Sequence, residues 1–196
     1  MRPTTPAAIL GALLFGLSSA GAATLEGSVT VEGRRAAHAV VYLEGLGAAV
    51  PGAMPGRVIM DQKNLTFEPD VLPVMRGTVI EFTNSDDVQH NVFSPSAIAG
   101  KFNLGTYGPG ATRTVTLDQP GDVRVLCNIH MEMEAHILVL NGPSFATAAE
   151  DGSYRIPDVP AGKYAVKVWR DHWRAVEQTL DVPATGHLSV DIRAGK

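Results

Sequence analysis

The sequence predicts an all-β protein built from β-sandwiches, and three observations support this fold class. No stretch beyond the first 23 residues has the apolar spacing of a helix of three turns. Short runs of alternating apolar and polar residues recur along the chain, as in half-buried strands. The 20 glycines and 13 prolines are spread along the sequence, which is typical of many turns and not of one disordered tract.

The first 23 residues have the pattern of an export signal. Arg2 precedes an apolar run over 7–15, and small residues follow up to Ala23. The run is too short to span a bilayer, so cleavage after Ala22 or Ala23 is favoured over an uncleaved anchor. We therefore expect an exported, periplasmic protein. No later stretch is apolar enough to be a transmembrane segment.

The charge of the chain excludes some classes of partner. Its formal net charge is −4 and becomes −5 once Arg2 is removed with the signal. There is no basic run of the kind that indicates nucleic acid or an anionic membrane surface. About 170 mature residues are enough for one large or two small domains.

Two strands are predicted at the front of the mature chain, over 25–31 and 39–43, with a polar turn between them. The following stretch, 45–55, is rich in Gly, Ala and Pro. Its side chains are too small to build a core, so we interpret it as a connector.

Residues 57–141 contain the longest series of short strands. The stretch 94–109 holds Gly100 and Gly105 and is predicted to be a loop. Many short alternating strands indicate a β-sandwich. The strands are predicted at 58–60, 66–67, 71–74, 78–84, 88–93, 112–117, 122–127 and 135–140.

The only cysteine of the chain lies at the end of one of these strands. Cys127 is followed by His130 and then by Met133, each three residues further on. A thiolate, an imidazole and a thioether at this spacing fit one tight loop around one metal ion, and this donor set with a second histidine selects copper. His90, on another strand, is the candidate for the second imidazole.

Other interpretations of the motif are weaker. A single cysteine is often a small buried hydrophobic residue, and a Cys/His protease pair usually lies far apart in sequence. A catalytic zinc site has no use for a methionine at this spacing, and a binuclear copper site would need a second cysteine. An unpaired thiol is also a liability after export, and a metal ion would protect it.

Residues 57–141 resemble the cupredoxins, the plastocyanin/amicyanin family of blue copper proteins. The pair His90-Asn91 and the spacing from Cys127 to Met133 match the short, amicyanin-like ligand loop. The stretches 60–69 and 90–94 look most like members labelled methylamine utilisation proteins. The resemblance implies a Greek-key sandwich with one copper ion at one end. It also implies single-electron transfer as the activity. We expect no enzymatic reaction, because a mononuclear site with all positions occupied leaves no open coordination position for a substrate.

The resemblance also assigns residues around the metal. Asn91 would steady the ligand loop by hydrogen bonding near Cys127. Many relatives have proline where this chain has Met131, so two methionines lie near the metal. We assign Met133 as the axial ligand from the family spacing and expect Met131 on the surface. Met131 and His136 remain the spare ligand candidates.

The last segment, 144–196, contains the turns D-G-S-Y-R-I and P-A-G-K-Y. It resembles a carboxypeptidase regulatory-like sandwich, a small Ig-like or transthyretin-like fold. The opening strands of such a domain match 27–29 and 39–43. We therefore expect residues 24–50 and 144–196 to form one sandwich with the copper domain inserted. A simple tandem is the alternative.

These features predict an exported type 1 copper protein that shuttles electrons between redox partners such as a c-type cytochrome or a dehydrogenase. Copper storage or delivery, and an envelope interaction module with auxiliary copper, are the alternatives. Glu132 and Glu134 would form an acidic rim around His130.

The remaining histidines are weaker candidates for metal ligands. His38 and His187 are predicted to be solvated, His136 exposed, and His172 a loop residue between Trp169 and Trp173.

Overall fold

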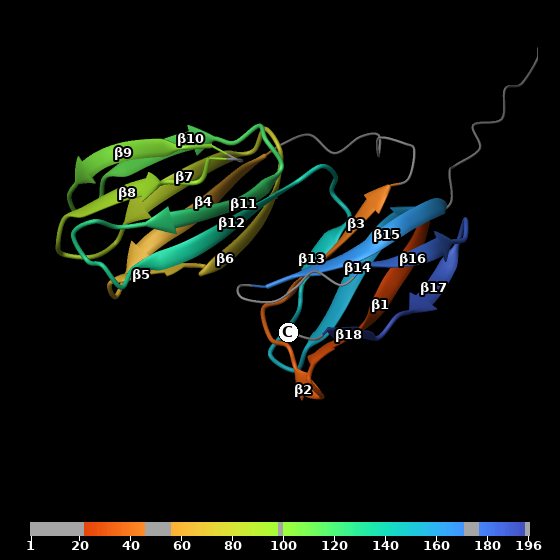
Figure 1. Cartoon of the computed structure of the whole chain (residues 1–196). Helices are drawn as coiled ribbons and strands as arrows, with labels where there is room; N and C mark the ends of the chain where they lie inside the picture. Colours follow the sequence, from red (N-terminus) through yellow and green to blue (C-terminus); the bar gives the residue numbers. More distant parts are fainter. Residues whose placement is uncertain (1–21, 46–55, 98–99, 171–176, 195–196) are drawn as a thin grey trace, which may run out of the picture.

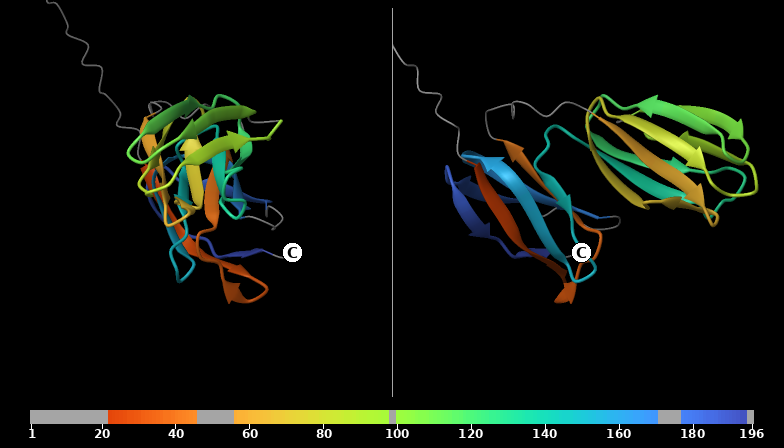
Figure 2. Two further views of the ribbon diagram at one scale, coloured as in Figure 1. Left: turned by 90° about the vertical axis from the view of Figure 1, so that its left-hand side faces the viewer. Right: turned by 180° about the vertical axis from the view of Figure 1, so that it is seen from behind.

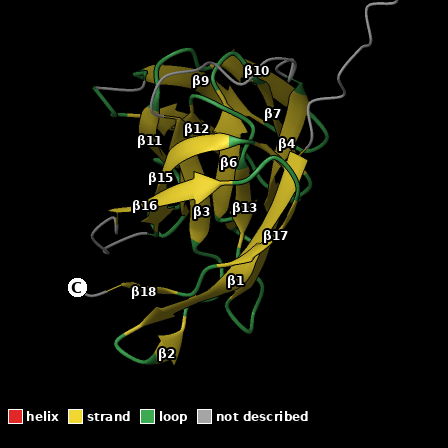
Figure 3. Cartoon of the chain, turned by 90° about the vertical axis from the view of Figure 1, so that its right-hand side faces the viewer, coloured by secondary structure: helices red, strands yellow, loops and turns green. Residues whose placement is uncertain are grey.

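The computed structural model describes residues 22–45, 56–97, 100–170 and 177–194. The predicted signal segment lies outside these ranges except for its last two alanines. His172, Trp173 and nearly all of the predicted connector also lie outside them. Every regular element within these ranges is a strand (Figure 3), so the all-β prediction is confirmed. No helix that could cross a membrane is found among the described residues.

The strands form two sandwiches (Figure 1). In the first, one sheet has the order β10-β7-β4-β5 and the other has the order β6-β12-β11-β8-β9. Its strands are β4 (Arg57–Lys63), β5 (Thr66–Glu68), β6 (Val71–Met75), β7 (Val79–Asn84), β8 (His90–Ser94), β9 (Phe102–Tyr107), β10 (Thr112–Thr116), β11 (Gly121–Leu126) and β12 (Glu134–Leu140).

The core of this sandwich follows the alternation in the sequence. In β7 the side chains of Ile80 and Phe82 are fully buried, while their neighbours are partly exposed. Successive side chains of a strand point to opposite faces of its sheet. Val123 and Val125 of β11 enter the same core, and Cys127 continues their face.

The prediction of a loop over the whole of 94–109 is wrong, because β9 lies within it. This strand pairs with β8 through His90–Tyr107 and Asn91–Thr106. Gly105 adopts a positive φ of 74° within it. The glycines made the local pattern look like a loop, but hydrogen bonding to the neighbouring strand outweighs this weak local preference.

The second, flanking sandwich combines the two ends of the described chain. One sheet has the order β14-β1-β17, with β2 and β18 also paired to β1; the other has the order β13-β3-β15-β16. Each sheet therefore contains strands from both sides of 57–141. The strands are β1 (Ala22–Val31), β2 (Arg34–Arg35), β3 (Val40–Gly45), β13 (Phe145–Thr147), β14 (Ser153–Pro160), β15 (Gly162–Trp169), β16 (Glu177–Val182), β17 (Gly186–Ser189) and β18 (Ile192–Ala194).

The two sandwiches contact each other along β12. Leu138 and Leu140 of this strand form a buried cluster with Val40 of β3. The partly buried side chains around the cluster come from both sandwiches: Tyr42, Val71, Phe145 and Trp169. The contact buries apolar surface between the sandwiches, so it opposes free movement of one against the other.

The prediction that His136 is exposed is wrong, because its residue exposure is 8%. It lies on the face of β12 that would be solvated in an isolated sandwich. There its ring lies 5.2 Å from the Trp169 ring, centroid to centroid. Its Nδ1 lies 2.8 Å from an Asp122 carboxylate oxygen. A strand pattern shows which residues share a face but not whether another domain covers that face.

Candidate metal centre

Two neighbouring strands bring the predicted ligands together. His90 is the first residue of β8, and Cys127 directly follows β11. The two strands are adjacent and antiparallel, with Leu126 opposite Phe93. The residues that follow β11 therefore run alongside the start of β8. Residues 127–133, which we call the ligand loop, lead from there to β12.

The donor atoms of three predicted ligands converge. One donor atom each from His90, Cys127 and His130 lies within 4.8 Å of the others. The Nδ1 atoms of the two histidines are 3.1 Å apart, and Cys127 Sγ is 3.9 Å from His90 Nδ1. His90 and Cys127 are buried, whereas His130 is half-buried. The group therefore has one edge toward solvent, at His130.

The ligand loop is closed by its own backbone. Met133 N–H donates to the His130 carbonyl at 3.1 Å, and Cys127 N–H donates to the Met133 carbonyl at 3.3 Å. The His130 N–H also points at Cys127 Sγ, 3.5 Å away. An N–H near sulfur stabilises a thiolate and tunes a metal bound to it.

The two methionines differ in their surroundings. Met133 is 1% exposed and packs in the same core cluster as Cys127. Met131 is 83% exposed. Met133 is thus buried in the core to which Cys127 belongs, whereas Met131 is exposed, and this favours Met133 as the thioether ligand.

Asn91 is buried at 4% exposure beside His90. Its side-chain N–H donates to Asn103 Oδ1 of β9 at 2.9 Å, and its own Oδ1 is a buried atom without a hydrogen-bond partner in the described structure. A contact from Asn91 to the ligand loop therefore stays a prediction.

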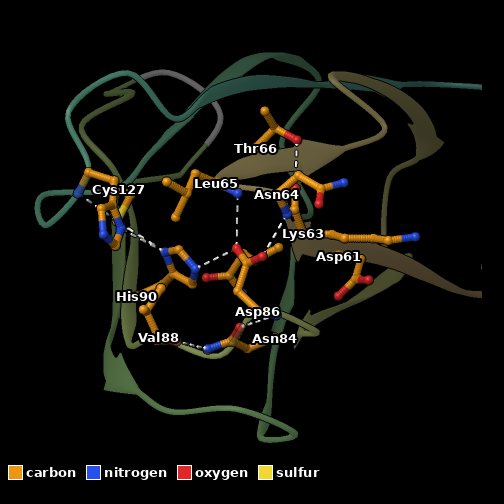
Figure 4. A network of polar contacts seen from close by, with 12 residues as sticks. Asp61, Lys63, Asn64, Leu65, Thr66, Asn84, Asp86, Val88, His90 and Cys127 are labelled. Atoms are coloured by element: carbon orange, nitrogen blue, oxygen red, sulfur yellow. Dashed lines mark hydrogen bonds and ion pairs between the residues drawn. The ribbon is translucent and has the colours of Figure 1, made fainter.

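Sequence reasoning missed a carboxylate behind the site. His90 Nε2 lies 2.9 Å from Asp86 Oδ2, and the Asp86 side chain is 13% exposed (Figure 4). Burial acts to raise the pKa of Asp86, but hydrogen bonds from Leu65, His90 and Asn64 outweigh it and lower the pKa. The carboxylate is therefore charged at neutral pH. An aspartate four residues before a candidate ligand histidine was the available signal.

A second buried polar group lies beneath the site. Tyr107, opposite His90 in β9, accepts a hydrogen bond from Gln62 Nε2 at 2.5 Å. Burial raises the pKa of Tyr107 to about 12, so its phenol stays protonated at neutral pH. This pair could not be predicted from the sequence, because neither residue belongs to a motif.

Within the part of the chain that the structure describes, an ion pair is found for only one of the two glutamates of the expected rim. Glu134 is held by the guanidinium of Arg124, with Nη2 2.7 Å from Oε2. Glu132 is exposed on the ligand loop. The rim around His130 is therefore weaker than the sequence suggested.

The donor spacing fits a single metal ion. Metal–nitrogen and metal–sulfur bonds are about 2.0–2.3 Å long in protein sites of this kind, so nitrogens 3.1 Å apart can share one ion. A thiolate with two imidazoles inside a β-sandwich defines the class of protein as one with a mononuclear soft-metal site.

Comparison with known families agrees with this class. Residues 56–140 match the copper binding proteins of the plastocyanin/azurin family. This part of the chain is a cupredoxin domain of that family, and its metal is copper. No curated protein matched the sequence.

Solved structures that resemble the chain include three copper proteins, each with a TM-score below 0.5. A copper-containing nitrite reductase from Thermus scotoductus has 25% identity and a TM-score of 0.41, and the match covers 50% of this chain and 25% of that one. A purple cupredoxin from Nitrosopumilus maritimus has 19% identity and a TM-score of 0.38, and the match covers 42% of this chain and 99% of that one. A reduced amicyanin mutant has 19% identity and a TM-score of 0.40, and the match covers 50% of this chain and 91% of that one.

The burial of the two methionines leads to a prediction. Replacing Met133 by leucine should keep copper bound but raise the reduction potential, because a weak axial donor that favours the oxidised ion is lost. We expect a shift of at least about 59 mV, a tenfold change in the one-electron equilibrium. Redox titration of the visible band measures it.

Met131→Leu is the matched control and should leave the potential nearly unchanged. If Met131→Leu shifts the potential and Met133→Leu does not, the axial assignment must be exchanged between the two methionines.

Proposed function

We propose that the protein is an exported electron carrier with one type 1 copper held by His90, Cys127, His130 and Met133. The observation that carries this proposal is the convergence of one thiolate and two imidazoles, with a buried methionine at the end of the same loop. Copper, when bound, supplies a one-electron couple between Cu(II) and Cu(I). With all four positions held by side chains, no position is left for a substrate, so we propose no enzymatic role.

The residues around the ligands favour fast electron exchange. His90 is held from behind by Asp86, and the ligand loop is closed by hydrogen bonds between its own backbone groups. Ligands held in this way change position little between oxidation states. The half-buried ring of His130 forms the edge through which we propose that electrons pass.

The ligand loop lies at the end of the cupredoxin domain that points away from the flanking sandwich (Figures 1 and 2). Large exposed apolar side chains are found on the loops of this end: Leu65, Val88, Ile129 and Met131. Val88 is two residues from His90, and Leu65 N–H donates to Asp86. We propose that this apolar end docks a redox protein such as a c-type cytochrome or a dehydrogenase.

Storage or delivery of copper is the rival function. A delivery protein binds and releases Cu(I), whereas a buried thiolate site with a closed loop is suited to hold both oxidation states. The test is the visible spectrum after loading with Cu(II), followed by reduction and reoxidation. The electron carrier should show an intense band that disappears and returns in full. Loss of copper during the cycle would favour delivery.

The charge near the docking end leads to a second prediction. Because Glu132 is exposed on the ligand loop, Glu132→Gln should slow oxidation by a basic c-type cytochrome by roughly two- to fivefold at low salt, since rim charges act on the association rate. Stopped-flow measurements over a range of ionic strengths should show a shallower salt dependence.

Asp158→Asn is the matched control, because it removes the same charge from an exposed position on the flanking sandwich. Glu134→Gln should have a smaller effect than Glu132→Gln, since Glu134 is paired with Arg124. Equal salt slopes for the wild type and Glu132→Gln would remove this charge from the docking step.

A further inference from the structure

One carboxylate connects the candidate metal centre to a distant turn. Asp86 accepts hydrogen bonds from His90 Nε2 at 2.9 Å, from Asn64 N at 2.6 Å and from Leu65 N at 3.1 Å (Figure 4). Asn64 and Leu65 form the turn between β4 and β5, which belong to the opposite sheet. The carboxylate is therefore held from two sides, by a ligand ring and by a backbone turn.

The turn itself is unusual. Asn64 and Leu65 have positive φ angles of 55° and 57°, the left-handed conformation that tight hairpins need at both central residues. Leucine rarely adopts it, since its Cβ crowds the following carbonyl. The two backbone N–H groups of this turn both point at Asp86, so the carboxylate stabilises a conformation that the sequence alone disfavours.

The loop that carries Asp86 is also fixed. Asn84 is 2% exposed. Its Oδ1 accepts a hydrogen bond from the Asp86 N–H at 3.0 Å, and its Nδ2 donates to the Val88 carbonyl at 2.8 Å. The asparagine thus bridges the loop from within. A carboxylate mounted on such a loop has little freedom to move away from His90.

The contact with His90 determines which ring nitrogen is free. The Asp86 carboxylate already accepts from two backbone N–H groups, so we take it as the acceptor from His90 as well, and Nε2 then carries the proton. The other nitrogen, Nδ1, then has its lone pair free, and it is this atom that faces Cys127 Sγ and His130 Nδ1. The hydrogen bond made by one nitrogen commonly selects the metal-binding nitrogen of a histidine in this way.

We propose that Asp86 is a positioning residue that presets His90 with Nδ1 toward the metal and that its negative charge lowers the reduction potential of the centre. This inference rests on the proposed function, because it takes His90 as a ligand. The charge lies at hydrogen-bond distance from one ligand, so it stabilises the more positive oxidation state through that ring. The β4–β5 turn keeps the charge in place.

The presetting is tested on the metal-free protein. Nitrogen-15 NMR of the His90 ring, at about pH 8, should show the Nε2–H tautomer almost alone in the wild type. Asp86→Ala should give a mixture of the two tautomers. Asp87→Ala, at the exposed neighbouring position, should leave the wild-type pattern. The same single tautomer in Asp86→Ala would overturn the positioning role.

The effect of the charge is tested on the copper-loaded protein. Asp86→Asn keeps an acceptor oxygen of the same size, so it should fold and retain the visible band. Its potential should rise by at least about 59 mV, equivalent to a tenfold shift in the one-electron equilibrium. Asp87→Asn removes the same charge one residue away and should shift the potential far less.

Equal shifts of the reduction potential in the two variants would overturn the proposal, because the loss of any nearby negative charge would then explain the effect. An unchanged potential in Asp86→Asn would also overturn it, while leaving the copper assignment intact. A wild-type protein without a visible band would instead count against the copper assignment, and the tautomer measurement would still decide the role of Asp86. The two failures are thus distinguishable.

Discussion

Replacing Cys127 by serine should abolish the visible colour of the copper-loaded protein. The intense band of a type 1 site arises from charge transfer from the thiolate to Cu(II), and Cys127 is the only thiol of the chain. Serine is similar in size to the 3%-exposed cysteine, so the fold should persist while essentially all of the band is lost. Absorption after loading with one equivalent of Cu(II) measures the effect.

The control for this variant is Met131→Leu, which also alters the ligand loop but should retain the band. Far-UV circular dichroism should be the same for all three proteins. Retention of the band in Cys127→Ser, with an unchanged fold, would falsify the ligand assignment.

Replacing Gly27 by alanine should destabilise the flanking sandwich selectively, so that it melts at a lower temperature than the cupredoxin domain. A Cβ at this position would lie 2.0 Å from the Val190 carbonyl oxygen and 2.6 Å from its carbon. That carbonyl also accepts a hydrogen bond from Tyr154, and Val190 N–H donates to Glu26. The backbone is therefore held on both sides and cannot easily yield. We expect a destabilisation of about 3 kcal/mol or more, a large part of the stability of an ordinary domain.

This variant tests the proposal that residues 57–141 are a domain inserted into a sandwich formed by 24–50 and 144–196. An inserted domain with its own core should keep its copper colour at temperatures where the flanking sandwich has melted. Thermal unfolding is followed in parallel by the visible band and by far-UV circular dichroism. Gly56→Ala, which meets no atom within 4 Å, is the control and should melt like the wild type.

Loss of colour together with the flanking sandwich in one transition would argue against independent domains. The buried contact of Leu138 and Leu140 with Val40 would then couple the unfolding of the two sandwiches. In that case the cupredoxin domain and the flanking sandwich would unfold as a single cooperative unit.

The sequence predicted most of the strands and the candidate ligands because both leave local signals. A strand with one buried face must alternate, and that alternation is visible in 78–84 and 122–127. A soft metal site with a short loop must place its donors close together along the chain, so the spacing from Cys127 through His130 to Met133 was visible without a fold. The second candidate ligand, His90, could be selected because the chain has few other histidines.

The tertiary structure alone decided features that depend on contacts between distant segments. β9 forms because β8 offers it an unpaired edge, although its own glycines suggest a loop. His136 is buried because Trp169 of another sandwich lies against it, and no periodicity within β12 could report this. Asp86 joins His90 to the β4–β5 turn because two sheets meet at that end. Periodicity and spacing are properties of a single segment, whereas cover, pairing and shared hydrogen bonds belong to pairs of segments that only folding brings together.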